Sequence, residues 1–341
     1  MNEPLPYAHG GPPASGVLRA EPADFRVDEV LGFEPSGSGE HAFVVVEKTG
    51  ANTEWVAREL ARAAGVAPLA VGFAGLKDRH AVTRQAFTVQ LAGRADPPWS
   101  SLAIAGVRVL SATRHNRKLK RGAHRGNRFR IVLRDVRGDR DAIEARIAAI
   151  AARGVPNYFG EQRFGRDGGN LALAARLFAG ERMPRERRGI ALSAARSELF
   201  NALLASRVGR GDWDRALDGE VWMLDGTHAI FGPEPWNDDL ARRLDAGDIH
   251  PTGPLWGRGE LRPTGAVAAL ERAAVAPFAS FADGLERAGL EQERRALRLR
   301  AAGLAYGWEA SDRLVVEFAL GSGSFATTVL REVCDWHAAP A

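Results

Sequence analysis

The segment LAVGFAGLKDRHAVTRQAFTVQLAG, residues 69–93, consists of two strand-like stretches joined by a polar loop. β-Branched and aromatic side chains favour strands at 69–75 and 85–93. The loop between them places one carboxylate, Asp78, among the basic residues Lys77, Arg79, His80 and Arg84. This acid has two interpretations: a surface ion pair with Arg79 or Arg84, worth roughly 0–1 kcal/mol, or a functional carboxylate beside an anionic ligand. The loop by itself favours neither.

Two glycines, Gly72 and Gly75, lie at the end of the first strand-like stretch. Because glycine has no side chain, we expect the backbone to turn sharply here and to leave room for a bulky ligand. The neighbouring cations would keep the Asp78 carboxylate ionised and would contact nearby phosphates.

The first 150 residues have the pattern of an α/β domain. Alternating or β-branched stretches predict strands, and capped amphipathic stretches predict helices. Strands are expected within 16–33, 41–50, 107–115 and 127–136, and helices over 53–64 and 139–154. In the strand 127–136, Phe129, Ile131 and Leu133 share one face, and arginines occupy the other.

The pattern changes after Gly154. Residues 171–306 read as mostly helical, including EQERRALRLRAAGL at 291–304, and strand patterning returns at 313–333. A sheet, a long helical block and a further strand predict an insertion into an α/β core. We therefore expect a discontinuous domain, 1–153 plus 307–341, whose C-terminal strand rejoins the N-terminal sheet, and an inserted domain at 154–306.

Positive charge is concentrated in one stretch. The chain has a net charge of +4, but residues 114–130 hold six arginines, two lysines and no acid, so this window is +8 and the remainder is −4. Such a patch attracts phosphate backbones; the alternative is a solvated basic loop. A single cysteine, Cys334, excludes an intramolecular disulfide. We expect a cytoplasmic protein with no membrane span, because there is no signal-peptide pattern and no long apolar run.

Several sequence motifs are absent. The chain contains no GxxxxGK[ST], GxGxxG, GxSxG or HExxH, and its eight histidines show no ligand spacing. Nucleotide hydrolysis, Rossmann redox chemistry, serine esterase chemistry and zinc hydrolysis therefore have no support from motifs. We expect chemistry without a metal or cofactor, for which an isolated carboxylate is the natural candidate.

The loop sequence GFAGLKDRHAVTRQ, residues 72–85, resembles the catalytic loop of the TruD family of tRNA pseudouridine synthases. The likeness extends along most of the chain, although residues 205–300 match weakly. The other similar segments are 18–53, 113–136, 154–165, 192–201 and 321–332.

The resemblance implies a fold and a reaction. The fold would be α/β (α+β), with a mixed, largely antiparallel sheet core, flanking helices and a largely helical insertion. The reaction would isomerise uridine to pseudouridine in tRNA, typically at position 13, without a cofactor. The catalytic aspartate falls on Asp78. A carboxylate could trap the sugar covalently or remove a ribose proton, and the sequence leaves both routes open.

The resemblance also implies residues that bind the target uridine. Asn127 would hydrogen-bond Asp78, and Phe129 would stack on the uracil, although strand alternation alone favours a core position for Phe129. Phe325 is a second candidate for the base pocket, with core packing as the alternative. Arg19 would contact phosphate or carboxylate. Phe25 would help to shape the pocket, although a buried strand position suits it better.

A larger set of cations would contact the RNA backbone, which positions the RNA without reading its sequence. These residues are Lys77, Arg79, Arg84, Arg114, Arg117, Lys118, Lys120, Arg121, Arg125 and Arg163. Phe159 and Phe164, near Arg163, are expected to be structural. The implied partner is tRNA, and the protein is expected to be a monomer with no protein partner.

Two other functions fit parts of the sequence. A non-catalytic RNA-binding or chaperone protein would use the same basic patch. A cofactor-dependent tRNA methyltransferase is a further class, but the absence of a glycine-rich nucleotide motif argues against it.

Overall fold

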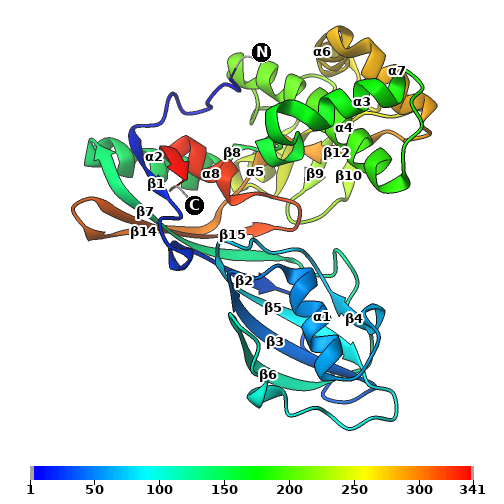
Figure 1. Ribbon diagram of the computed structural model, residues 1–341. Coiled ribbons are helices and arrows are strands. Elements are labelled where there is room, and N and C mark those ends of the chain that lie inside the picture. Colours follow the sequence, from blue (N-terminus) through cyan, green and yellow to red (C-terminus); the bar gives the residue numbers. More distant parts are fainter. Residues whose placement is uncertain (1–3, 339–341) are drawn as a thin grey trace. The chain divides into compact units, whose positions relative to one another are not determined.

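The computed structural model describes residues 4–338, which form two compact units (Figure 1). The sheet unit comprises Pro13–Ile147, Ala301–Gly323 and residues 334–338. The helical unit comprises Ala148–Arg300, Ser324–Val333 and residues 4–12. The chain therefore passes between the two units several times.

The sheet unit contains most of the strands. They are β1 (Ala14–Leu18), β2 (Phe25–Val30), β3 (His41–Thr49), β4 (Val71–Phe73), β5 (Val82–Gln90), β6 (Val107–His115), β7 (Gly126–Gly138), β14 (Ala302–Ala310), β15 (Arg313–Gly321) and β16 (Cys334–Ala338). Helix α1 (Thr53–Ala63) lies in this unit, and α2 (Arg140–Arg153) begins in it.

These strands form one mixed sheet. Its main path is β14-β15-β7-β2-β5-β3-β6, with β1, β16 and β4 attached beside it. The pairs β2–β5 and β1–β16 are parallel, and the other pairs are antiparallel. The predicted return of the C-terminal strand is confirmed, because β15 pairs with β7 and places Phe318 opposite Phe129. The predicted fold class, a mixed sheet with flanking helices, is also confirmed.

Helix α1 covers one face of the sheet, as Figure 1 shows. Its apolar residues Val56 and Leu60 pack against Val44 and Val46 of β3, and all four are fully buried. A fully buried aliphatic side chain contributes roughly 1.5–3 kcal/mol to stability. Gly65, at φ 62°, follows the helix and suits the turn that ends it.

The helical unit combines helices with short strands. Its helices are α3 (Gly169–Phe178), α4 (Arg185–Gly209), α5 (Asp238–Ala246), α6 (Gly265–Val275), α7 (Ala279–Arg287) and α8 (Ala326–Val333). Its strands are β8 (Val155–Pro156), β9 (Trp222–Leu224), β10 (Ile230–Phe231), β11 (Ile249–Leu255), β12 (Glu293–Ala296) and β13 (Arg298–Leu299). Within residues 4–338, no helix is both long enough and apolar enough to cross a membrane.

One helix prediction is wrong. Residues 291–304 contain β12, β13 and the start of β14, and β12 completes a four-stranded sheet in the order β10-β9-β11-β12. The Glu, Arg and Ala content of this stretch favours a helix, and its burial shows no simple alternation, because Leu297, Arg298 and Leu299 are all buried. Pairing with β11 and β8 decides the conformation.

Candidate active site

The Asp78 loop, residues 74–81, connects the antiparallel strands β4 and β5. The Asp78 side chain is 42% exposed, and its Oδ2 accepts a hydrogen bond from Arg19 at 2.8 Å. An ion pair is therefore present, but its partner is neither Arg79 nor Arg84, the two that we expected. Within the described residues, no hydrogen bond reaches Oδ1, so that oxygen is open to a ligand.

The backbone of the loop is held along its length. It is fixed by Gly122 N to Ala74 O at 2.8 Å, Gln85 Nε2 to Gly75 O at 3.1 Å, Lys77 N to Thr53 Oγ1 at 3.0 Å and Gly50 N to Arg79 O at 3.1 Å. Neighbouring elements thus satisfy several polar backbone groups of a segment that has no regular secondary structure. Asp78 is therefore an exposed carboxylate on a fixed backbone.

Lys48, which the sequence interpretation did not single out, lies under this loop. It is fully buried at the end of β3, and its Nζ donates to the carbonyl oxygens of Ala51 and Asp78 at 2.8 and 2.9 Å. Burial lowers the Lys48 pKa to about 8, opposed by the attraction of Asp78. Strand alternation could have found this residue, because Lys48 shares the face of Val44 and Val46.

The two glycines serve a purpose other than the one expected. A Cβ on Gly72 would lie 2.4 Å from the Leu119 carbonyl oxygen, and one on Gly75 would lie 3.2 Å from the His124 ring. The space beside both glycines is filled by the chain itself, so the expectation that it admits a ligand is wrong.

The basic run packs onto β4. In its loop 116–125, Leu119 is buried and its N–H donates to Thr88 Oγ1 at 2.9 Å. The Arg121 guanidinium lies over the Phe73 ring, 4.1 Å from its centroid, and Lys118 Nζ donates to the Leu69 carbonyl. These contacts, with the Gly122–Ala74 hydrogen bond, bring the basic run to the Asp78 loop.

The cations that were predicted to contact RNA phosphates differ in their burial and in whether they form ion pairs with carboxylates. Lys77 must be removed from the set, because its side chain is only 4% exposed and its Nζ pairs with the buried Glu29 at 2.7 Å. Carboxylates also pair with Arg84 (Glu47), Arg114 (Asp96) and Arg121 (Glu54). Four of the predicted cations are exposed and form no ion pair with any described residue: Arg79, Arg117, Lys120 and Arg125.

Arg19 connects Asp78 to a pair of aromatic rings. Its backbone has φ 61°, which is uncommon for a residue with a side chain. Its guanidinium lies 4.2 Å from the centroid of Phe25, and the Phe25 and Phe129 rings pack edge to face with their centroids 6.2 Å apart. Both rings are buried, at 2% and 6% exposure, so Phe25 and Phe129 are core residues in this structure. Stacking of Phe129 on a base stays a prediction.

Asn127 lies on β7 opposite Glu29 of β2. No hydrogen bond joins Asn127 to Asp78 among the described residues, and Arg19 takes the place that we expected Asn127 to fill. The Asn127 Oδ1 atom is buried without a hydrogen-bond partner. Its amide is therefore a polar group that a ligand could still satisfy.

Two of the predicted site residues belong to the helical unit. Phe325 packs against an apolar cluster that includes Phe159 and Phe200. Arg163 donates to Ser193 Oγ at 2.7 Å and lies over Phe159, and burial lowers its pKa. Their contacts with a substrate stay predictions.

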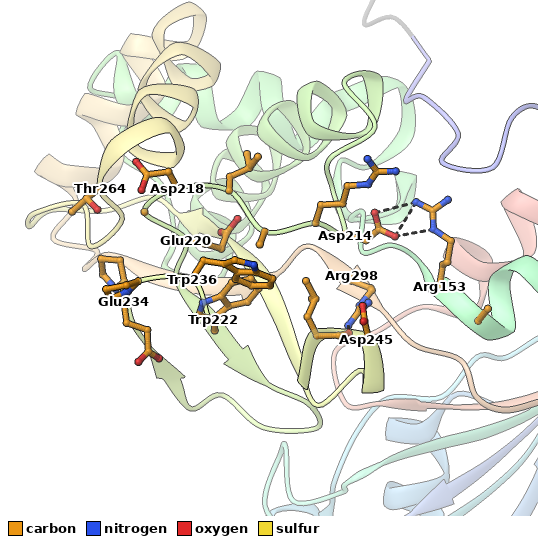
Figure 2. A pocket seen from close by; sticks show the side chains of 18 residues that line it. Arg153, Asp214, Asp218, Glu220, Trp222, Glu234, Trp236, Asp245, Thr264 and Arg298 are labelled. Carbon is orange, nitrogen blue, oxygen red and sulfur yellow. Dashed lines mark hydrogen bonds and ion pairs between the residues drawn. The ribbon is translucent and has the colours of Figure 1, made fainter. Parts of the chain in front are cut away.

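The helical unit also contains a cavity of about 970 Å³, shown in Figure 2. Trp222 and Trp236 lie beside each other in it, and Arg153 pairs with Asp214. Burial raises the pKa of the lining residue Glu220 to about 7. Five acidic and three basic residues line the cavity, and none is a predicted site residue. This acidic surplus disfavours a phosphate backbone.

Comparisons with known proteins agree along the chain. A family model for tRNA pseudouridine synthase D (TruD) matches residues 4–180 and 172–333. Proteins named tRNA pseudouridine synthase D from Xanthomonas axonopodis pv. citri and Methylococcus capsulatus are 52% and 53% identical; each match covers 97% of this chain and 94% of the relative.

A solved structure shows the same fold. It is the crystal structure of the putative tRNA pseudouridine synthase D from Methanosarcina mazei, which superposes with a TM-score of 0.74 at 22% identity. The match covers 96% of this chain and 95% of that one.

Proposed function

Because the chain belongs to the tRNA pseudouridine synthase D (TruD) family, we propose that it isomerises uridine to pseudouridine in tRNA, at position 13, with Asp78 as the essential carboxylate. The names of the relatives support the reaction. The observation that carries the assignment of Asp78 is its geometry: an exposed carboxylate, with one oxygen open, on a loop whose backbone is fixed.

The reaction moves the uracil from an N-glycosidic to a C-glycosidic bond. Cleavage of the C–N bond leaves the sugar electron-deficient, and Asp78 either bonds to C1′ or removes the proton from C2′. In both routes the anion must face the ribose in a fixed position. Arg19 holds Oδ2 at 2.8 Å and so leaves Oδ1 for the sugar.

RNA binding is assigned to the exposed cations of the basic run. Arg117, Lys120 and Arg125 lie on the loop 116–125, which is hydrogen-bonded to the Asp78 loop through Gly122 and Ala74. Contacts with phosphates position the RNA and carry no sequence information. We therefore expect the choice of position 13 to depend on RNA shape and on the inserted domain.

The test is Asp78→Asn, assayed by chemical mapping of pseudouridine in an unmodified tRNA. We expect the rate to fall by at least about 10²-fold, with tRNA binding retained. Asp248→Asn is the matched control, because Asp248 is also exposed and accepts one hydrogen bond from an arginine, Arg243. It should keep full activity.

Three results would contradict the proposal. Full activity in Asp78→Asn would remove Asp78 from the mechanism. Wild-type protein that binds tRNA but forms no pseudouridine would favour the non-catalytic RNA-binding function. A gain in RNA mass would indicate methylation, because isomerisation leaves the mass unchanged.

A further inference from the structure

Lysine is rare in this chain, and its positions are not scattered. There are four lysines and 42 arginines. The four are Lys48, Lys77, Lys118 and Lys120, all in the sheet unit. Lys77 lies in the Asp78 loop, and Lys118 and Lys120 lie in the loop that packs beside it. Lys48 is separate in sequence but lies directly beneath Asp78.

The hydrogen bonds of Lys48 match the shape of an ammonium group. An ammonium has three donors, and Lys48 Nζ contacts three carbonyl oxygens, those of Ala51 at 2.8 Å, Asp78 at 2.9 Å and Lys77 at 3.4 Å. Two of these acceptors belong to the Asp78 loop, and the third follows β3. A planar guanidinium fork would not reproduce this arrangement.

We propose that Lys48 is a positioning residue for catalysis, which acts by fixing the backbone of Asp78 against strand β3. The proposal rests on the proposed function of Asp78. Lys48 itself does not contact the carboxylate within hydrogen-bonding or ion-pair distance in the described structure. It holds the peptide from which that carboxylate projects.

The buried charge of Lys48 lowers the stability of the fold, because it must be removed from water. The side chain is fully buried, and no carboxylate of the described residues forms an ion pair with it. An aliphatic residue would continue the apolar stripe of Val44 and Val46 without this desolvation cost. Local features that cost stability are typical of functional sites.

Two charged groups act on the Lys48 ammonium. They are the Asp78 carboxylate, paired with Arg19, and the Lys77 ammonium, paired with Glu29. When Lys48 loses its proton it also loses one donor, so one of the three carbonyl contacts must be given up. We therefore expect the rate of the wild-type enzyme to fall as the pH rises through the Lys48 pKa of about 8.

The experiment compares Lys48→Met with Val46→Ala and Asp78→Asn. A displacement of about 1 Å in a catalytic group can cost about 10²-fold in rate, so Lys48→Met should lower kcat by about 10- to 100-fold with KM for tRNA unchanged. Lys48→Met should also lack the decline above the Lys48 pKa. Val46→Ala removes buried contacts from the same stripe, and it should keep both kcat and the wild-type pH profile.

The outcomes separate this inference from its premise. If Lys48→Met keeps the wild-type kcat while Asp78→Asn is inactive, Lys48 is not a positioning residue and the proposed function stands. Equal losses of kcat in Lys48→Met and Val46→Ala, with unchanged pH profiles, would show a purely structural role. If Asp78→Asn is active, the premise itself fails. Should Lys48→Met not fold, a wild-type rate that stays constant through the Lys48 pKa would overturn the inference.

Discussion

The two cations on either side of Asp78 in the sequence, Lys77 and Arg79, differ in burial. Lys77 is buried against Glu29, whereas Arg79, two positions along the chain, is exposed, and its side chain donates to the Gly50 carbonyl. Glu29 is buried as well, and its second oxygen accepts from Ala86 N at 3.1 Å. Lys77 therefore stabilises the loop, whereas the Arg79 side chain is exposed to solvent.

Removing the Lys77 charge should destabilise the protein. Lys77→Met leaves the Glu29 carboxylate buried without its cation, which costs about 3–5 kcal/mol when a buried pair is broken. Urea denaturation measures the change in the free energy of unfolding. Arg79→Met is the control, and we expect it to change stability by less than about 0.5 kcal/mol.

A second variant tests the cause of this loss. Lys77→Met combined with Glu29→Gln removes both charges and keeps an acceptor for Ala86 N. It should recover most of the stability, because replacing both members of a buried pair is often nearly neutral. A double variant as unstable as Lys77→Met would show that the side-chain packing, and not the charge, is responsible.

The loop 116–125 and strand β4 fit together only because Gly72 has no side chain. The Leu119 carbonyl and the Lys118 side chain both approach the position that a Cβ would occupy, at 2.4 and 2.7 Å. The Leu119 N–H is also held by Thr88 Oγ1, which lies 2.8 Å from the same position. The loop 116–125 therefore cannot move away from a side chain at position 72 without losing its contacts with β4.

Gly72→Ala should therefore loosen this contact between elements. Inserting a methyl group into a packed site typically costs about 1–3 kcal/mol, and we expect faster amide exchange in 118–122 as well as a lower urea midpoint. Gly169→Ala in α3 is the control, since no atom lies within 4 Å of its Cβ position. It should leave stability unchanged or raise it by up to about 1 kcal/mol. Equal behaviour of the two variants would contradict this account of Gly72.

At the scale of the whole molecule, charge is unevenly divided. Residues 114–130 carry +8 in a chain of net charge +4, whereas the lining of the cavity in the helical unit has more acidic than basic residues. Binding of an RNA backbone should therefore depend on the sheet unit and weaken with salt.

The salt dependence of tRNA binding tests this division. Each lost phosphate contact reduces the slope of log K against log salt by about 0.7–0.9, so Lys120→Gln with Arg125→Gln should reduce it by about 1.5. Filter binding over a range of salt concentrations measures the slope. Arg242→Gln, an exposed arginine of the helical unit, should leave the slope unchanged, and an equal effect would contradict the assignment.

Local sequence determined much of this protein. Periodicity was sufficient for helix α1, for strands β4 and β5 and for the strand that carries Phe129, because neighbouring residues alone decide these patterns; the N-terminal cap expected for α1 makes no side-chain hydrogen bond to it. The acid at Asp78 and the basic run were visible for the same reason. Only the tertiary structure decided that Arg19 pairs with Asp78, that Lys77 is buried, that Lys48 supports the loop and that 293–299 forms strands. Their partners lie far away in the chain, and burial depends on which distant segments pack together.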